Sequence, residues 1–194
     1  MNNFPKKWFF MDPSKKESII TLYYKTSKDG VIFFNKKFGI NKTLLEKTEK
    51  HMNYCRINGI PFLYPYSLSK AIRYKASGLY LPLPQYYAST KNKLALNNIP
   101  KNMIIATSVH NQREILASNK LNYNIVFISP AFTTMTHRDM APHETIKFIN
   151  LCKIPNARVY ALGGIDKKNF QLLKNKHLSG FGAITYFKNQ TRKL

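Results

Sequence analysis

Short apolar runs alternate with amphipathic stretches along most of the chain, most regularly in its second half. The apolar runs are rich in β-branched and aromatic residues, which favours strands, and the stretches between them carry apolar residues at helical spacing. In the second half, strands are predicted at 103–110, 124–132, 157–164 and 180–187, and helices at 112–121, 143–152 and 167–176. Near-continuous apolar strands separated by short helices indicate a parallel sheet buried on both faces.

The first half follows the same alternation less cleanly. Strands are predicted at 8–11, 31–34, 60–66 and 78–84, and helices at 42–57 and 67–76. Asn41 and Ser67 are expected to cap these two helices, and Gly59 is expected to end the first of them. Eight parallel strands predict a single, compact (β/α)8 TIM barrel over residues 1–194, with a short or missing last helix because little chain follows the last strand. A doubly wound sheet would also alternate, but it typically uses five or six strands.

Composition constrains the partners. The 31 Lys and Arg against 9 Asp and Glu give a formal charge of +22, so an anionic partner must be considered. The basic residues are spread through the whole chain and lysine outnumbers arginine, whereas readers of nucleic-acid bases favour arginine. Nucleic-acid binding is therefore possible but the least favoured role.

Two further features concern the compartment. No apolar stretch approaches the roughly 18 residues that span a bilayer, so we expect a soluble, cytoplasmic protein with no membrane partner. The only cysteines, Cys55 and Cys152, have no metal-ligand spacing and fit a reducing compartment. We expect both to be small buried side chains.

Glycines at two predicted strand ends indicate a phosphate site. Gly163 and Gly164 end the run VYALGG, where main-chain N–H groups could approach an anion without an intervening Cβ. The segment 180–185, which includes Ile184 and Thr185, could supply the second half of the site. These loops follow the seventh and eighth strands, where this fold commonly binds phosphate. A plain tight turn is the alternative explanation of the glycine pair.

Hydroxyl and histidine side chains follow two other predicted strands. The segment TTMTHRD at 133–139 offers clustered hydroxyls and His137 as donors to phosphate, or it is an ordinary polar loop that caps the next helix. His110 ends the fifth strand beside Ser108, but no carboxylate is obviously paired with it, so packing explains the two residues as well as catalysis does. The remaining histidines, expected on helix surfaces, are His51, His143 and His177.

Three motifs together resemble the thiamine phosphate synthase/TenI superfamily, a (β/α)8 barrel group. They are SVHNQREILASNKLNYNIVFISPAFTTMTH, VYALGGIDKKNFQLL and GFGAITYF, in the family's order and spacing over about 104–187. The resemblance implies a role in thiamine biosynthesis and a site for a thiazole phosphate, which the synthase joins to an aminopyrimidine pyrophosphate with Mg²⁺, expelling pyrophosphate. It implies phosphate ligands at Thr134, Thr136, Gly164, Ile184 and Thr185, a lysine for pyrophosphate at Lys37 and a serine near the reacting centre at Ser108. Ser108, His110 and His137 are the candidate catalytic residues.

The chain departs from the family pattern where the metal is expected. Pro65 and Tyr66 replace an Asn-Asp pair after the third strand, and Gln85 replaces a second aspartate, so both expected Mg²⁺ carboxylates are absent and no cofactor is evident. Without them a pyrophosphate leaving group lacks a metal to neutralise its developing charge. The characteristic histidine of TenI-like tautomerases aligns with Pro130, so that chemistry is not supported either.

Three functions stay open. The first is a divergent thiamine-pathway enzyme, a synthase-like transferase that binds thiazole phosphate or thiamine phosphate. The second is a non-catalytic phosphate-ligand binder or partner subunit, and the third is a basic nucleic-acid-binding protein with steep salt dependence. Tyr66, Tyr80 and Gln85 could build a different site for a stacked planar ring in place of the metal, or the tyrosines could be core packing. The oligomeric state is not predicted.

Overall fold

The strands close into a barrel in which every neighbouring pair is parallel. The computed structural model describes residues 4–34, 42–81, 83, 99–133, 141–173 and 175–191. The barrel runs in chain order through β1 (Lys7–Met11), β2 (Asp29–Phe33), β3 (Phe62–Pro65), β4 (Gly78–Tyr80), β5 (Ile104–Val109), β6 (Ile125–Ile128), β7 (Arg158–Leu162) and β8 (Leu178–Ala183), and β8 pairs with β1. The predicted (β/α)8 barrel is therefore confirmed.

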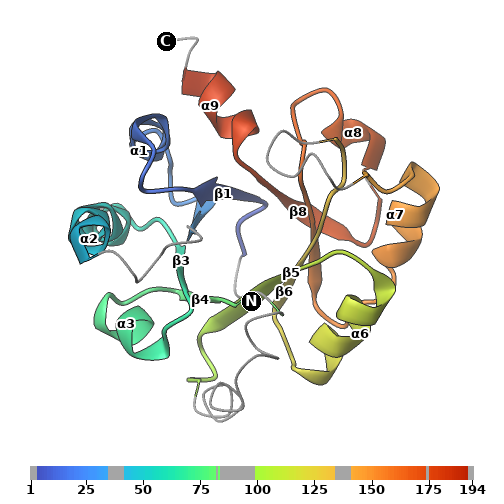
Figure 1. The fold of residues 1–194 in the computed structure, drawn as a ribbon, viewed down its shortest axis with the longest axis horizontal. Helices are drawn as coiled ribbons and strands as arrows, with labels where there is room; N and C mark the ends of the chain where they lie inside the picture. The colour runs from blue at the N-terminus through green and yellow to red at the C-terminus, as the bar shows by residue number, and fades with distance from the viewer. Residues whose placement is uncertain are drawn as a thin grey trace.

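Helices form a ring outside the strands (Figure 1). They are α1 (Lys16–Leu22), α2 (Lys42–Ile57), α3 (Leu68–Arg73), α6 (Gln112–Lys120), α7 (Thr145–Leu151), α8 (Phe170–Leu173) and α9 (Thr185–Thr191). The cap expected at Ser67 is confirmed, because its side chain accepts a hydrogen bond from the Lys70 N–H. Gly59 follows α2 with a φ of 63°, the left-handed conformation that ends many helices. The cap expected at Asn41 lies outside the described residues.

The end of the chain differs from the prediction. Residues 180–187 were expected to form one strand, but β8 ends at Ala183 and α9 begins at Thr185. The helical turn lets Phe187 pack inward, with its ring centroid 5.3 Å from that of Phe9. Burial of this ring outweighs the strand preference of an aromatic and β-branched sequence. The last helix is short, as expected.

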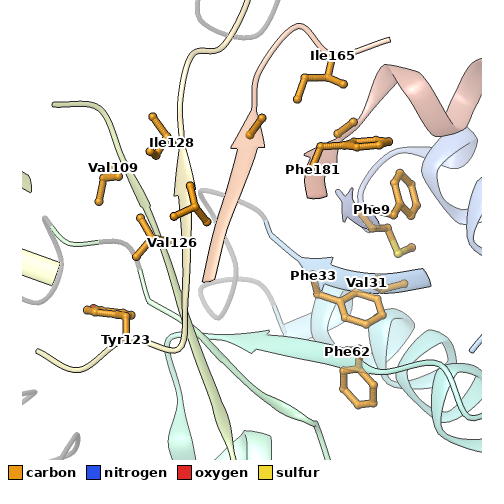
Figure 2. Close-up of a cluster of buried hydrophobic side chains, with 14 of the residues drawn as sticks. Phe9, Val31, Phe33, Phe62, Val109, Tyr123, Val126, Ile128, Ile165 and Phe181 are labelled. Carbon is orange, nitrogen blue, oxygen red and sulfur yellow. The ribbon is translucent and has the colours of Figure 1, made fainter. Parts of the chain in front are cut away.

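A first core lies between the barrel and its helices. Outward-facing strand residues such as Phe9, Val31, Phe33, Phe62 and Val126 belong to it, and Figure 2 shows these side chains together with others of the same cluster. They alternate with inward-facing residues because successive side chains of a strand point to opposite faces. Cys55 and Cys152 belong to the same core, and burial raises the pKa of both thiols to about 12. The expectation that both cysteines are buried is confirmed.

A second core fills the inside of the barrel with aromatic rings. Phe10 is edge-on to Tyr80, with centroids 5.5 Å apart, and edge-on to Phe127 at 5.1 Å. Two glycines make room for such large rings, because a Cβ at Gly30 would collide with the Trp8 ring and a Cβ at Gly182 would collide with Phe10. The residues of this interior cluster are Trp8, Phe10, Ile32, Leu63, Tyr80, Ala106, Ile125, Phe127 and Tyr160. The barrel is thus a packed core.

None of the helices among the described residues is both long and apolar enough to cross a membrane.

Candidate functional site

The candidate residues gather at the carboxyl ends of the strands, which is the catalytic end of this fold. Ser108 is near the end of β5, Gly163 and Gly164 follow β7, and Ile184 follows β8. Leu162 is opposite Gly182 in the register of β7 and β8. The chain segments that leave these two strands therefore start side by side, as the sequence prediction required.

Gly163 and Gly164 are needed for their turn and also because a neighbouring chain segment approaches their backbone closely. Gly163 and Gly164 have φ values of 94° and 65°. A Cβ on Gly164 would collide with the carbonyl oxygens of Phe132 and Thr133. The Phe132 N–H also donates to the Gly163 carbonyl over 3.1 Å. The segment after β6 is thus pressed against the glycine pair, which brings the start of the threonine motif to it.

Two amide donors near these contacts have no acceptor among the described residues. The Gly163 carbonyl accepts from Phe132, and the Gly164 carbonyl accepts from Asn169 Nδ2 over 2.7 Å. Because a trans peptide turns its N–H opposite to its C=O, the Gly164 N–H points away from Phe132. Within the described ranges, neither the Gly164 nor the Ile184 N–H has a hydrogen-bond acceptor. Thr185 begins α9, where N–H groups lack intrahelical partners.

Several predicted residues cannot be compared with the structure. Lys37, Gln85, Thr134, Thr136 and His137 lie outside the described residues. Their assigned roles stay predictions.

Ser108 has a partner that sequence reasoning did not assign to it. Its Oγ lies 2.6 Å from the Tyr80 hydroxyl, which comes from the end of β4. Tyr80 is only 8% exposed, and burial raises its pKa to about 12 although the hydrogen bond to Ser108 acts in the opposite direction. Tyr80 is therefore a neutral phenol. The sequence could have suggested this contact, since Tyr80 and Ser108 are predicted on adjacent strands.

His110 is not paired with Ser108 among the described contacts. Its Nδ1 lies 2.8 Å from the Ser129 carbonyl oxygen at the end of β6. A carbonyl only accepts, so Nδ1 carries a proton and donates, which selects the tautomer in which Nε2 is the acceptor. The His110 backbone N–H donates to Glu114 Oε2 over 2.8 Å, which fixes the residue further. The geometry makes His110 a ring held in one tautomer.

The three histidines expected on helix surfaces are less exposed than predicted. His51 is 8% exposed, and His143 has a buried Nε2 without a hydrogen-bond partner in the described part of the chain. His143 precedes α7, and its backbone N–H donates to the Pro130 carbonyl over 3.2 Å. Burial lowers the pKa of both rings, and neighbouring lysines act in the same direction. His177 lies in a turn before β8 and is half-buried. The expected helix is therefore confirmed for His51 but its expected exposure is wrong, His143 is half-buried just before α7, and the expected helix is wrong for His177.

The side chains that the structure describes at the ends of β3 and β4 do not fit a magnesium ion. Pro65 offers no side-chain ligand, and Tyr66 is a half-buried phenol whose pKa is raised by burial. Asp166, in the glycine loop, accepts from the Lys168 and Asn169 N–H groups, both over 2.8 Å, so it holds its own turn. The described residues contain no group of three or more His, Cys, Asp or Glu that could hold a metal ion.

Comparison with known proteins identifies the family. The family model described as thiamine monophosphate synthase matches residues 19–186, which is most of the chain. The chain belongs to the thiamine monophosphate synthase family. This agrees with the resemblance carried by the three sequence motifs and with the adjacent loops after β7 and β8.

The similar curated proteins are thiamine-phosphate synthases. One from Prochlorococcus marinus is 26% identical over 172 residues, and the match covers 88% of this chain and 48% of that protein. One from Syntrophomonas wolfei is 26% identical over 179 residues, with 87% and 80% covered. The chain thus spans about half the length of the first relative and most of the second.

Among solved structures, the thiamine phosphate pyrophosphorylase from Pyrococcus furiosus superposes with a TM-score of 0.69 at 17% identity. The match covers 97% of this chain and 94% of that one. At this identity the likeness supports the barrel fold.

Proposed function

We propose that this protein acts in thiamine biosynthesis by binding thiazole phosphate or thiamine phosphate at the carboxyl end of its barrel. The observation that carries the proposal is a pair of N–H donors, on Gly164 and Ile184, that have no acceptor in the described part of the chain and lie at adjacent strand ends of a member of this family. Main-chain donors held by the fold suit a phosphate because they need no reorganisation when the anion binds.

Further groups complete the proposed site. Thr185 adds its N–H next to Ile184, and the segment that presses on Gly164 continues into Thr134 and Thr136, which we propose as hydroxyl donors to the same phosphate. His110, with Nε2 as the acceptor, is the proposed proton acceptor among the described candidates. The roles of Lys37 in pyrophosphate binding and of His137 in catalysis stay predictions from the family resemblance, and both residues lie outside the described ranges.

Synthesis that depends on Mg²⁺ is not part of the proposal. A departing pyrophosphate develops charge that must be neutralised, and the described ends of β3 and β4 offer a proline and neutral phenols there. The same observation favours a second candidate function, a phosphate-ligand binder without synthase activity. Incubation with thiazole phosphate and aminopyrimidine pyrophosphate, with and without Mg²⁺, separates such a binder from a divergent synthase, because only a synthase forms thiamine phosphate.

Binding itself is tested by thermal unfolding with thiazole phosphate, thiamine phosphate and pyrophosphate, each with and without Mg²⁺ and at two salt concentrations. A ligand at about 100 times its dissociation constant adds roughly 2.7 kcal/mol to the free energy of unfolding. We expect a shift with the thiazole or thiamine phosphate that Mg²⁺ does not change. An equal shift with every polyanion, lost at high salt, would contradict the proposal and point to the net charge of +22 instead.

A further inference from the structure

The carboxyl end of the barrel divides into two chemically different halves. The ends of β7 and β8 present main-chain N–H groups, whereas the ends of β3, β4 and β5 carry the hydroxyl residues Tyr66, Tyr80 and Ser108, of which the last two have their hydroxyls in contact. We propose that this second half, the hydroxyl half, binds an uncharged planar aromatic ring, without a diphosphate and without Mg²⁺. The inference rests on the proposed function, since the ring would lie beside the phosphate ligand.

Strand register brings the three hydroxyl residues together. Pro65 is opposite Tyr80 in the pairing of β3 with β4, and the Tyr66 N–H donates to the Tyr80 carbonyl over 3.4 Å. Tyr80 is opposite Ala106 in the pairing of β4 with β5, so Ser108 lies two residues nearer the carboxyl end on the same face. The long Tyr80 side chain spans that difference and reaches Ser108.

The paired hydroxyls leave one proton for a ligand. Tyr80 and Ser108 carry two O–H groups, and the 2.6 Å contact between their oxygens uses one of them as donor. The other can donate to an acceptor such as a ring nitrogen. The pair is uncharged at neutral pH, because burial holds the phenol in its neutral form. Its single spare donor suits a neutral acceptor better than the several charged oxygens of a diphosphate.

Aromatic rings adjoin the hydroxyls. Phe34 follows β2 and is partly exposed, and its ring is edge-on to Phe10 at 5.7 Å. Phe10 is in turn edge-on to Tyr80. Such rings favour a planar ligand, which can contact their faces or edges while its own edge meets the spare donor. Aromatic and hydroxyl groups at these strand ends therefore favour an uncharged planar ligand over a charged diphosphate.

Calorimetry with two probes tests this inference. The probes are an aminopyrimidine alcohol, which is uncharged, and its diphosphate, each titrated with and without Mg²⁺. We expect the alcohol to bind as tightly as the diphosphate, within about threefold, and Mg²⁺ to change neither affinity. Y80F and S108A should each weaken binding of the alcohol by roughly tenfold, as expected for a lost hydrogen bond. Y24F, at a tyrosine that is 51% exposed before β2, is the control and should change nothing.

Two results would overturn the inference. One is a diphosphate that binds more than about tenfold tighter when Mg²⁺ is added, and the other is failure of both ring compounds to bind. Thiazole phosphate titrated into the same samples reports on the proposed function separately. Loss of that binding in G164A, with ring binding retained, supports both; wild-type protein that binds the ring but no thiazole phosphate would contradict the proposed function alone.

Discussion

Lys188 Nζ lies 3.1 Å from Glu17 Oε1, and this ion pair joins the last helix, α9, to the first, α1. Next to it Phe187 is buried, 1% exposed, against Phe9, and the Lys25 ammonium lies 4.2 Å from the centre of the Phe187 ring. The outer ring of helices is therefore closed by a surface charge pair and a buried aromatic residue at neighbouring positions.

The two contacts should differ greatly in their contribution to stability. K188A should lower the free energy of unfolding by about 0.5 kcal/mol or less, because Glu17 is 57% exposed and surface pairs are screened by water and salt. F187A should lower it by about 3 to 5 kcal/mol, because it leaves a cavity between α9 and β1. Urea denaturation of both variants measures the difference. Similar losses in the two would contradict this prediction and show that the charge pair holds α9 as strongly as the ring does.

Alanine at Gly164 should damage the phosphate site more than alanine at a similar glycine elsewhere. Gly164 and Gly59 have nearly equal φ values, 65° and 63°, but a Cβ on Gly164 meets backbone oxygens whereas one on Gly59 meets only Ser27 Cβ at 3.9 Å. G59A should lose about 1 kcal/mol from the left-handed backbone alone. G164A should lose more and should abolish binding of thiazole phosphate. Retained binding in G164A would show that this loop does not hold the phosphate.

Stability should fall as the solution is acidified through the range where histidine titrates. The pKa of His51 and of His143 is lowered in the folded protein, chiefly by burial. In the unfolded chain both return to about 6.5. Below that pH the unfolded chain binds more protons than the folded one, so the free energy of unfolding is retained above about pH 6.5 and decreases as pH falls toward the lowered values.

Urea midpoints at about pH 7.5 and about pH 5.5 check this dependence. H51Q and H143Q should each show a smaller decrease between the two conditions than the unmodified protein. H177Q is the matched comparison for the loss of a histidine side chain. A midpoint that does not change on acidification would contradict the assigned burial of both rings.

Asparagine and glutamine, whose side-chain amides can each replace one ring nitrogen of histidine, should behave differently at position 110. In H110N the side-chain NH₂ occupies about the place of Nδ1 and can still donate to the Ser129 carbonyl, whereas the amide of H110Q extends beyond it. H110N should therefore keep most of the stability and the ligand affinity, and H110Q should lose about 1 kcal/mol. Denaturation and ligand titration of both variants provide the measurement. Equal stability of the two would show that the Nδ1 bond contributes nothing.

The strands could be predicted from sequence because burial on both faces makes them nearly continuous apolar runs.

The helix α1 was missed because polar residues, Ser18 and Thr21, lie on its buried face while Ile20 is 46% exposed. Its apolar residues therefore do not show helical spacing. The Thr21 hydroxyl satisfies itself by donating to the Glu17 carbonyl, which makes its burial possible. The spacing of apolar residues could not show that polar residues occupy the buried face of this helix.

Within the candidate site, the glycine pair could be predicted because a left-handed backbone conformation favours glycine, and two adjacent glycines are visible in the sequence. The partners of Ser108 and His110 could not be assigned, because both bonds join different strands and depend on register: Tyr80 is 28 residues from Ser108 and Ser129 is 19 residues from His110. The burial of His51 was missed for a related reason, since a polar side chain on a helix gives no sign of the face that the barrel covers.

The fit of aromatic rings to glycines inside the barrel restricts how the protein can be recombined. Trp8 is opposite Gly30 on one side and Gly182 on the other, and the rings of Trp8 and Phe10 fill the space that side chains at these two glycines would take. Consider a chimaera that takes β1 from this protein and β8 from a homologue with a larger residue at 182. The interior of its barrel would hold more side-chain volume than it has room for, whichever sequence supplied the loops. The first, second and eighth strands therefore have to be exchanged as one block, even though they come from opposite ends of the barrel sequence.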